Sequence, residues 1–326
     1  MSFSLLGVGS PLLDIIISAD EEFLAKHVPG EKGGMEPLAS REISRIVNSS
    51  GTTPGIYPGG AAGNTVMALS RFGVKTALRG KIARDEMGEK YIKFAEQYGA
   101  DTSNLIISPQ GDTGCCLAIV TSDAERTMRS ALGVSLELTS REIKESDFQS
   151  FDAVLIEGFM VYSGVLEDMV RYAKRAGRCV IFDLASFEIA SKFKSMFLGF
   201  ISDVDILVAN QSEAAAFTGF DDPQKSLAVL KKLVPCAIVK CGADGVYFSG
   251  YGEEFFVPSS PVDEVVDTTA AGDLWLAGFI CGRDRGMTLR KSVECGTLFA
   301  SKIIRHQGSV LSDDDVAELK ISISEM

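Results

Sequence analysis

The segment from Asp267 to Asp273, which reads DTTAAGD, could bind an anion and activate a hydroxyl group. It comes directly before the apolar run Leu274–Ile280, which is typical of a helix. Small residues let backbone N–H groups crowd around a ligand, and a helix start carries partial positive charge, so no basic side chain is required. Asp273 would lie at the mouth of this site, where its carboxylate could take a proton from an incoming hydroxyl. The alternative interpretation is a tight turn in which an Asp caps the helix.

Two segments near the start of the chain carry groups that suit the hydroxyls of a ligand. Asp14 follows the first strand-like run, and a carboxylate, which only accepts hydrogen bonds, could hold a pair of hydroxyls. Gly59, Gly60 and Asn64 precede a helical pattern; the glycines permit close backbone approach, and Asn64 offers a donor and an acceptor. The structural alternatives are a turn or cap for Asp14 and a helix cap for Asn64.

Two further polar clusters follow strand-like runs in the second half of the chain. Asn210 and Glu213 come after the run 206–209, and the carboxyl ends of strands are where open α/β sheets bind ligands. Glu213 could hold a hydrated Mg²⁺ through water, although the pair could equally form a capping box, or do both. The segment Lys240–Gly245 follows the run 237–239, and its glycines indicate a turn close to a ligand.

The elements that must position these groups alternate between strand-like and helix-like runs. This alternation predicts an α/β fold with a mostly parallel sheet covered by helices on both faces. The strand-like runs are Leu5–Val8, Ala153–Ile156, Cys179–Phe182, Ile206–Ala209 and Ala237–Val239. The helical patterns are Gly63–Phe72, Gly88–Tyr98, Val165–Arg175, Gln211–Phe217 and Pro223–Leu233.

One stretch, residues 113–128, departs from the alternation. It contains a β-rich run with two adjacent cysteines, a polar turn at 122–125 and a short second arm, which together predict a hairpin with no helix between its arms. Such a hairpin often serves as a lid or an oligomer contact. We therefore expect a single domain over residues 1–326, with a lid formed by approximately 15–46 and 112–130.

Composition narrows the classes of function. The chain has 326 residues, of which 46% are hydrophobic, enough for a large core. The net charge of -12 argues against nucleic acid and anionic membranes as partners, and no apolar run of about 18 residues predicts a membrane span. Seven cysteines without a C-x-x-C motif favour free thiols and a cytoplasmic location. Two histidines argue against a His-ligated metal or a Ser-His-Asp hydrolase.

Common nucleotide-binding motifs are absent or incomplete in the sequence. Gly7-Val8-Gly9 starts like a dinucleotide fingerprint, but Leu12 stands at the place of the third glycine. No segment spells G-x-x-x-x-G-K-[ST]. Any nucleotide site must therefore be of another kind.

In this order, the segments resemble the ribokinase-like (PfkB) family of small-molecule kinases, over essentially the whole chain. The specific part is Asp267–Asp273 with Ala277-Gly278 after it, and the elements Gly59-Gly60…Asn64 and Asn210-x-x-Glu213 support it. Within the family, the chain is most similar to the adenosine-kinase branch. This similarity is carried by Gly9–Asp14, Glu125–Met128, Ala131–Gly133, Glu157–Phe159 and Arg305–Gly308.

The resemblance implies a ribokinase-like three-layer sandwich with a small β-sheet lid, and it implies a role for each motif. Asp273 would deprotonate the acceptor hydroxyl, and the backbone amides of Ala270, Ala271, Gly272 and Asp273 would hold the transferred phosphoryl group. The acceptor would be held by Asp14, Gly59, Gly60, Asn64 and Glu157. ATP would be bound by Asn210, Glu213, Lys240, Gly242, Gly245 and Thr268. Glu213 would hold Mg²⁺ through water, and Asp267 and Thr269 would lie near a monovalent cation, usually K⁺.

Two features bear on the substrate. The phosphate-binding segment of the family usually begins with Gly, whereas this chain has Ala270. An Ala is acceptable at this position if its φ is negative. Its presence slightly favours a sugar substrate. The adenosine branch holds the base between apolar and aromatic residues, a role for which Phe159, Met160 and Tyr162 are candidates.

Three hypotheses about function follow. The first is an ATP-dependent kinase for the 5′-hydroxyl of adenosine, and the second is a kinase for a free sugar such as ribose or fructose. They differ in whether an apolar slot for a purine lies beside the ribose site. The third is a non-catalytic ligand-binding protein on the same fold, against which the presence of Asp273 speaks. The expected partners are a small-molecule substrate and a second copy of the chain through the lid.

Overall fold

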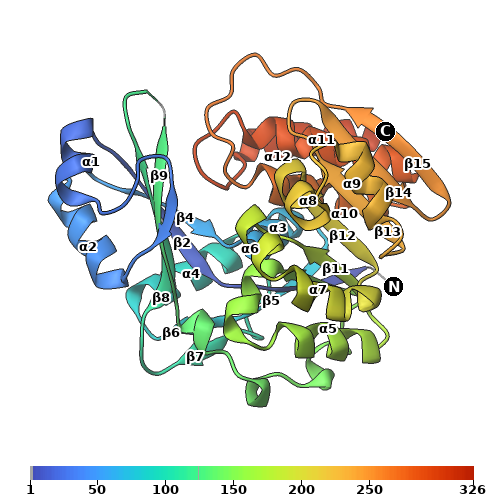
Figure 1. Ribbon diagram of the computed structural model, residues 1–326, viewed down its shortest axis with the longest axis horizontal. Coiled ribbons are helices and arrows are strands. Elements are labelled where there is room, and N and C mark those ends of the chain that lie inside the picture. Colours follow the sequence, from blue (N-terminus) through green and yellow to red (C-terminus); the bar gives the residue numbers. More distant parts are fainter. Residues whose placement is uncertain (1–2, 124) are drawn as a thin grey trace.

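The computed structural model describes residues 3–123 and 125–326 (Figure 1). Its larger part is built on an eight-stranded sheet in the order β15-β14-β13-β12-β11-β10-β1-β5. The strands are β1 (Ser4–Val8), β5 (Lys75–Arg79), β10 (Ala153–Glu157), β11 (Cys179–Asp183), β12 (Ile206–Asn210), β13 (Cys236–Lys240), β14 (Gly245–Gly250) and β15 (Glu253–Pro258). The pairings from β5 to β13 are parallel, and β14 and β15 extend the sheet in antiparallel pairing. All five strand-like runs of the predicted alternation lie in this sheet.

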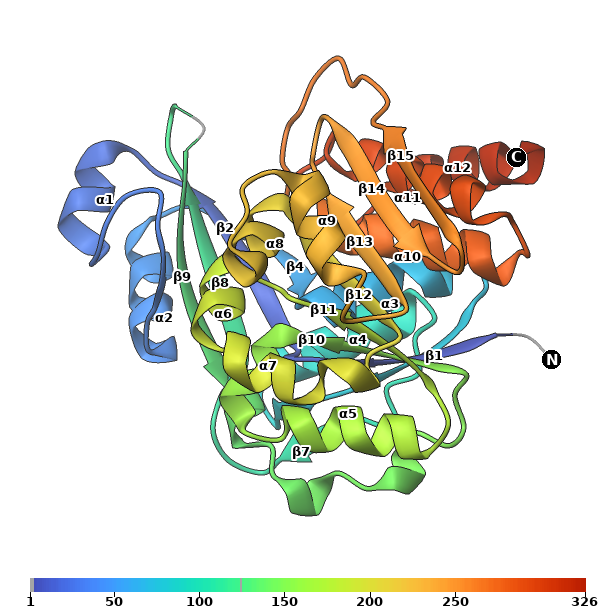
Figure 2. The same cartoon turned by 45° about the vertical axis from the view of Figure 1, so that its right-hand side comes forward.

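Helices cover both faces of the large sheet, which confirms the expected three layers (Figure 2). One face carries α3 (Ala61–Arg71), α4 (Glu86–Gln97), α10 (Ala271–Asp284), α11 (Leu289–Ile303) and α12 (Asp313–Glu325). The other carries α5 (Leu166–Arg175), α6 (Phe187–Lys192), α7 (Lys194–Phe200), α8 (Gln211–Thr218) and α9 (Pro223–Leu230). Successive strand side chains point to opposite faces, so Leu155 packs in the first layer and Ile156 in the second. This two-sided burial explains why the strands read as continuous apolar runs.

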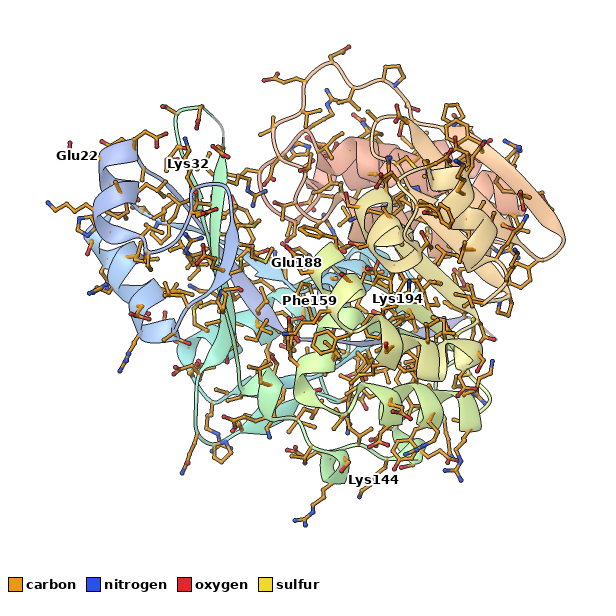
Figure 3. The ribbon with its side chains drawn as sticks, viewed as in Figure 1. Glu22, Lys32, Lys144, Phe159, Glu188 and Lys194 are labelled. Carbon is orange, nitrogen blue, oxygen red and sulfur yellow. The ribbon has the colours of Figure 1, made fainter. Side chains whose placement is uncertain are left out.

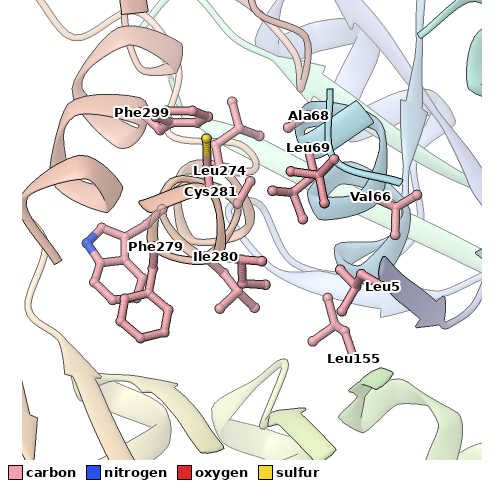
Figure 4. Close-up of a cluster of buried hydrophobic side chains, with 14 of the residues drawn as sticks. Leu5, Val66, Ala68, Leu69, Leu155, Leu274, Phe279, Ile280, Cys281 and Phe299 are labelled. Atoms are coloured by element: carbon pink, nitrogen blue, oxygen red, sulfur yellow. The ribbon is translucent and has the colours of Figure 1, made fainter. Parts of the chain in front are cut away.

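The helix that follows the DTTAAGD segment, α10, is enclosed by its neighbours. All residues from Leu274 to Gly282 are buried, and the helix lies between α3 and α11 (Figure 4). A Cβ at Gly278 would lie 2.7 Å from the carbonyl oxygen of Cys295, so glycine is required for the close approach of α11. Tight packing on all sides holds α10 in place, and with it the residues of its first turn.

A second sheet lies to one side of the large one, in the order β3-β9-β8-β2-β4 (Figure 1). Its strands are β2 (Leu12–Ser18), β3 (Met35–Pro37), β4 (Gly55–Gly59), β8 (Thr113–Val120) and β9 (Arg126–Gly133). The pair β8–β9 is the predicted hairpin, and its turn includes Ala124, which lies outside the described residues. The sheet is larger than predicted, because β4, the start of β2 and the end of β9 fall outside 15–46 and 112–130.

Two short helices, α1 (Glu21–His27) and α2 (Ser40–Ser49), cover the outer face of the small sheet. Their buried residues Leu24, Ile43 and Ile46 pack with Ile17 and Leu117 of the strands in a separate apolar cluster. The remaining elements are the strand pair β6 (Lys81–Ala83) and β7 (Ile106–Ser108) and the 3₁₀ helices Val134–Glu137, Ser140–Glu142, Glu145–Asp147, Gly158–Ser163 and Ile201–Asp203. Of the helices in the described ranges, none combines the length and the apolar character needed to cross a membrane.

Candidate active site

A cavity of about 390 Å³ lies between the inner face of the small sheet and the carboxyl edge of the large sheet. Asp14, Asn64, Arg126, Glu157 and Asp273 line it together with apolar side chains. Figure 3 shows Phe159, another lining residue, between the small sheet and the layered body of the molecule. The cavity therefore brings together segments that are far apart in the chain.

Asp273 is the third residue of α10, and its carboxylate faces the cavity. Its Oδ2 accepts a hydrogen bond from Asn64 Nδ2 at 2.9 Å, and its main-chain oxygen accepts one from Thr65 Oγ1 at 3.1 Å. Ala270, not Asp273, is the N-terminal cap of the helix, so the capping interpretation of this Asp is wrong. Burial raises the pKa of Asp273 from 3.8 to about 6, and the Asn64 bond opposes this rise. A carboxyl group with a pKa near neutrality suits a general base.

The turn before α10 presents free backbone donors. Ala271 N–H donates to the Thr268 carbonyl at 3.2 Å, whereas the amides of Ala270, Gly272 and Asp273 have no acceptor within the described part of the chain. Open N–H groups at the start of a helix can hold an anion.

Ala270 adopts a left-handed conformation, with φ at 58°. The condition under which the sequence made Ala acceptable here, a negative φ, is therefore not met. The chain must turn sharply at Ala270 to enter the helix, and a residue with a Cβ bears about 1–2 kcal/mol of strain in this conformation. Strain of this kind is concentrated at functional sites, and Ala185, at φ 67°, is a second case on the same cavity.

Asp14 lies on β2, next to the turn that begins α3. A Cβ at Gly59 would lie 2.9 Å from the Asp14 carboxylate, and one at Gly60, whose φ is 87°, would lie 2.5 Å from the Ser10 carbonyl. Both glycines are thus needed for close approach. Burial raises the pKa of Asp14 to about 7; Arg126 opposes this rise, and the acids around it add to it.

Asn64, in the first part of α3, keeps one polar atom without a protein partner. Its Oδ1 is buried and accepts no hydrogen bond from the described residues, while its Nδ2 donates to Asp273. A buried acceptor left open at the wall of a cavity is a place for a hydroxyl donor from a ligand.

Glu157 is the last residue of β10, and protein donors occupy its carboxylate. Its Oε1 accepts a hydrogen bond from Ser10 N–H at 2.7 Å, and its Oε2 accepts one from Ala62 N–H at 2.9 Å. It thereby caps the start of α3 and ties it to the turn between β1 and β2. Burial raises its pKa to about 7. Glu157 thus has a scaffold role, and because it also lines the cavity, the acceptor contact expected from the sequence stays a prediction.

Asn210 and Glu213 form a capping box at the start of α8. Glu213 Oε1 and Oε2 accept hydrogen bonds from Asn210 Nδ2 at 2.6 Å and from Asn210 N–H at 2.7 Å, and Asn210 Oδ1 accepts one from Glu213 N–H at 2.9 Å. Burial, followed by the charge of Asp183, raises the pKa of Glu213 to about 7. The structural interpretation of this motif is therefore confirmed.

The same edge offers oxygen atoms that suit Mg²⁺. Asp183 ends β11 one strand away from Glu213, and Mg²⁺ retains several waters when carboxylates and phosphates bind it. Within residues 3–123 and 125–326, no three His, Cys, Asp or Glu side chains lie close enough to hold a metal directly. Both carboxylates already accept hydrogen bonds, Asp183 from Lys240 and Ala185 and Glu213 from Asn210, so they would contact a hydrated ion through its waters.

Lys240 ends β13, Gly242 lies in the turn that follows, and Gly245 is the first residue of β14. Lys240 Nζ donates to Asp183 Oδ2 at 3.3 Å and to the Gly272 carbonyl at 3.4 Å, so this side chain points toward the DTTAAGD turn. Gly242 has a φ of 55°, and a Cβ at Gly245 would lie 2.2 Å from the Val257 carbonyl. The glycines shape the turn.

Asp267 and Thr269 were expected near a monovalent cation, but protein donors fill the Asp267 carboxylate. Its Oδ1 accepts hydrogen bonds from Thr269 N–H at 2.9 Å, from Thr269 Oγ1 at 2.7 Å and from the Arg126 guanidinium, and its Oδ2 accepts one from Gly308 N–H at 2.9 Å. Arg126 also contacts Thr269 Oγ1. A guanidinium already supplies the positive charge, so these two side chains do not fit an additional monovalent cation.

Sequence reasoning missed Arg126 and Asp183 as site residues. In the sequence, Arg126 is visible only as part of Glu125–Met128, a segment similar to the adenosine-kinase branch. Its place at the cavity depends on how the hairpin folds over residues 267–269. Asp183 directly follows the predicted strand 179–182 and is the last residue of β11, just as Glu157 and Lys240 end β10 and β13. A polar residue that ends a buried parallel strand is the signal that could have identified it.

The rest of the cavity wall combines serine and threonine side chains with apolar ones. The apolar side chains on the small sheet are Leu12, Met35, Cys116, Ala118, Met128 and Leu132. Of the three residues considered for holding a base, Phe159 lines the cavity, Met160 is buried in the core, and Tyr162 is exposed and packs on Phe193. The structure therefore supports one of the three.

The fold and the site define a phosphotransferase with an alcohol group as acceptor. Residues 39–315 match the profile of the pfkB family carbohydrate kinase, and the chain belongs to this family. It is 26% identical to the adenosine kinase of Schizophyllum commune over 94% of this chain and 96% of that one. It is 27% identical to the 5-dehydro-2-deoxygluconokinase of Geobacillus thermodenitrificans over 82% of this chain and 84% of that one.

Solved structures show the same similarity. A probable sugar kinase from Rhizobium etli has a TM-score of 0.87 at 26% identity and 99% coverage of both chains. The adenosine kinase of Sinorhizobium meliloti has a TM-score of 0.86 at 26% identity and covers 98% of this chain and 99% of its own. The relatives thus include kinases named for sugars and kinases named for adenosine.

Proposed function

We propose that the protein transfers the γ-phosphate of ATP to a primary hydroxyl of a neutral ribofuranosyl compound, and that this compound is adenosine, phosphorylated at its 5′-hydroxyl. The observation that carries the proposal is the charge of the cavity wall. Asp14, Glu157 and Asp273 are acids, and the one basic side chain among the described lining residues, Arg126, is paired with Asp267. An anionic acceptor such as a sugar acid or a sugar phosphate would meet repulsion there.

The apolar part of the wall supports a nucleoside over a free sugar. Met35, Met128, Leu132 and Phe159 face the same cavity as Asp14 and Asn64. Asp14 and the open Asn64 Oδ1 suit ribose hydroxyls, and the apolar side chains suit the flat face of a base. A free sugar would leave these side chains in contact with water.

In the proposed reaction, Asp273 accepts the proton of the acceptor hydroxyl as the hydroxyl oxygen attacks the γ-phosphorus of ATP. The bond from this phosphorus to the β–γ bridging oxygen breaks, and ADP leaves. The amides of Ala270, Gly272 and Asp273 meet the negative charge of the transferring group. ATP approaches along the edge that carries Asn210, Glu213, Gly242 and Gly245, and Thr268 is one of the residues that line the cavity. Mg²⁺ bound with the nucleotide through Asp183 and Glu213 would neutralise phosphate charge.

The small sheet is proposed to act as a lid over the acceptor. Its outer face is covered by α1 and α2 of the same chain, so a homodimer through the lid would be restricted to the edge strands β3 and β4. The seven cysteines are free, which fits the proposed cytoplasmic location.

A panel of acceptors with ATP and Mg²⁺ tests the proposal, with phosphate transfer measured directly. Adenosine, inosine, ribose, fructose and 5-dehydro-2-deoxygluconate cover the nucleoside, neutral-sugar and sugar-acid classes. We expect the highest kcat/KM with adenosine and none above background with the sugar acid. A preference for ribose or fructose would support the free-sugar alternative, and preference for the acid would overturn the argument from charge. Binding without transfer to any acceptor would support a non-catalytic role.

A further inference from the structure

The side chain of Lys240 connects two parts of the site that are distant in sequence. It starts at the last residue of β13 and reaches across the end of β12, so that Nζ lies 3.3 Å from Asp183 Oδ2 at the end of β11. The same Nζ lies 3.4 Å from the Gly272 carbonyl oxygen in the first turn of α10. The side chain is only 12% exposed. A buried lysine in this position requires compensation by acceptors and negative charge.

Gly272 is matched to this lysine. An added Cβ at Gly272 would lie 2.9 Å from Lys240 Nζ, and no other group would come within 3.4 Å of it. The backbone of Gly272 does not have a positive φ, so the turn itself does not demand glycine at this residue. The absence of a side chain at 272 therefore makes room for the ammonium group.

The ammonium group is held by an ion pair. Asp183 Oδ2 on β11 lies 3.3 Å from Nζ, and a lysine side chain paired with a carboxylate keeps the positive charge that lysine ordinarily carries. The lysine is therefore a fixed cation in contact with the first turn of α10, where the backbone amides are open. This cation also opposes the rise in the pKa of Asp273.

We propose that Lys240 is a positioning residue for phosphoryl transfer. Its ammonium group donates a hydrogen bond to the Gly272 carbonyl and thereby fixes the orientation of the open amides at Ala270, Gly272 and Asp273. It also places a permanent positive charge close to the transferred phosphoryl group. This inference rests on the proposed function. It gives a specific role to a residue that the family resemblance placed only on the ATP side.

Kinetics of Lys240→Met, Lys240→Gln and Lys240→Arg test the proposal. We expect Lys240→Met to lower kcat about 10- to 100-fold with little change in the KM of the acceptor, because misplacement of a reacting group by about 1 Å can cost 10²-fold. Lys240→Gln keeps a donor for the Gly272 carbonyl without the charge, and Lys240→Arg keeps the charge, so each should recover part of the loss. Lys231→Met removes an exposed ion pair with Glu254 and is the matched control, expected to behave as wild type.

Calorimetric binding of ADP and AMP-PNP with Mg²⁺ provides a second measurement that needs no acceptor. We expect Lys240→Met to weaken AMP-PNP about tenfold more than ADP, because the cation acts on the terminal phosphoryl group. Equal weakening of both nucleotides, or wild-type kcat in Lys240→Met, would overturn the inference. Nucleotide binding does not depend on the identity of the acceptor. If the wild type failed to phosphorylate adenosine, that result would count against the proposed function, and nucleotide binding would still test the role of Lys240. If Lys240→Met does not fold, as judged by thermal unfolding, Lys240→Gln replaces it in both measurements.

Discussion

The side-chain amide of Asn64 donates a hydrogen bond to Asp273 Oδ2 at 2.9 Å, across 209 residues of sequence. The bond joins the first half of α3 to the first turn of α10 and leaves Oδ1 of Asp273 for another partner. It also favours the charged form of the carboxylate. This pair is the point at which the acceptor-binding and phosphate-binding halves of the candidate site meet.

Replacement of Asp273 by Asn should remove most of the turnover and leave the fold intact. Loss of a positioned base typically costs about 10²–10⁴-fold. Phosphate transfer measured at saturating ATP checks the loss, and circular dichroism checks the fold. Asp284→Asn, an exposed Asp at the other end of the same helix, is the control and should keep wild-type activity. Near-wild-type turnover in the Asp273 variant would refute the assignment of the base.

The activity of the wild type should fall as the pH drops through about 6. The base must be ionised to accept a proton, and burial places the pKa of Asp273 at about 6. Asn64→Leu removes the bond that favours ionisation, so the acidic limb of the kcat/KM profile should move to higher pH. A limb at the same pH in wild type and variant would show that the Asn64 bond does not influence the base.

Glu157→Gln should destabilise the protein by about 1–3 kcal/mol, because an amide group would face two backbone N–H donors that now share a carboxylate. Denaturant unfolding measures the loss.

The raised pKa of Glu157 has a second consequence: the folded state binds its proton more tightly, so this group's contribution to stability is lost as the pH rises from about 4.5 through about 7. This part of the pH dependence should be absent from the Gln variant, and an unchanged slope would contradict it.

Ala270→Gly should raise the stability of the protein by up to about 1 kcal/mol, because glycine adopts the left-handed conformation of this residue without strain. The greater conformational entropy of glycine in the unfolded chain offsets part of this gain. Turnover should persist, since the backbone amide remains. Thermal unfolding compares the variant with Ala270→Val, which should be less stable than wild type. A lower melting temperature for the Gly variant would mean that the residue is not strained.

Turnover should be the same in potassium chloride and in tetramethylammonium chloride at equal ionic strength. The reason is that Arg126, Thr269 and Gly308 already occupy the Asp267 carboxylate. Arg126→Met would vacate one of these contacts, and a gain of potassium dependence in this variant alone would support the reasoning. Strong activation of the wild type by potassium would show that the cation is held without this carboxylate.

Many features of the protein were determined by the sequence alone. Apolar runs and helical patterns predicted the strands from Leu5–Val8 to Ala237–Val239, the helices between them and the hairpin, because buried parallel strands and amphipathic helices leave a local, periodic trace. The small residues before Leu274 indicated an anion-binding turn for the same reason: the backbone chemistry of a helix start is local.

Only the tertiary structure decided how the polar groups are used. Glu157 caps α3 through Ser10 and Ala62, Arg126 lies on Asp267, and Lys240 lies below Gly272. None of these pairs is close in sequence, and each depends on how two sheets and their helices are placed against one another. A side chain's type states which hydrogen bonds and charges it can offer, but the partner that satisfies them inside a protein is selected by long-range packing, which leaves no periodic signal along the chain.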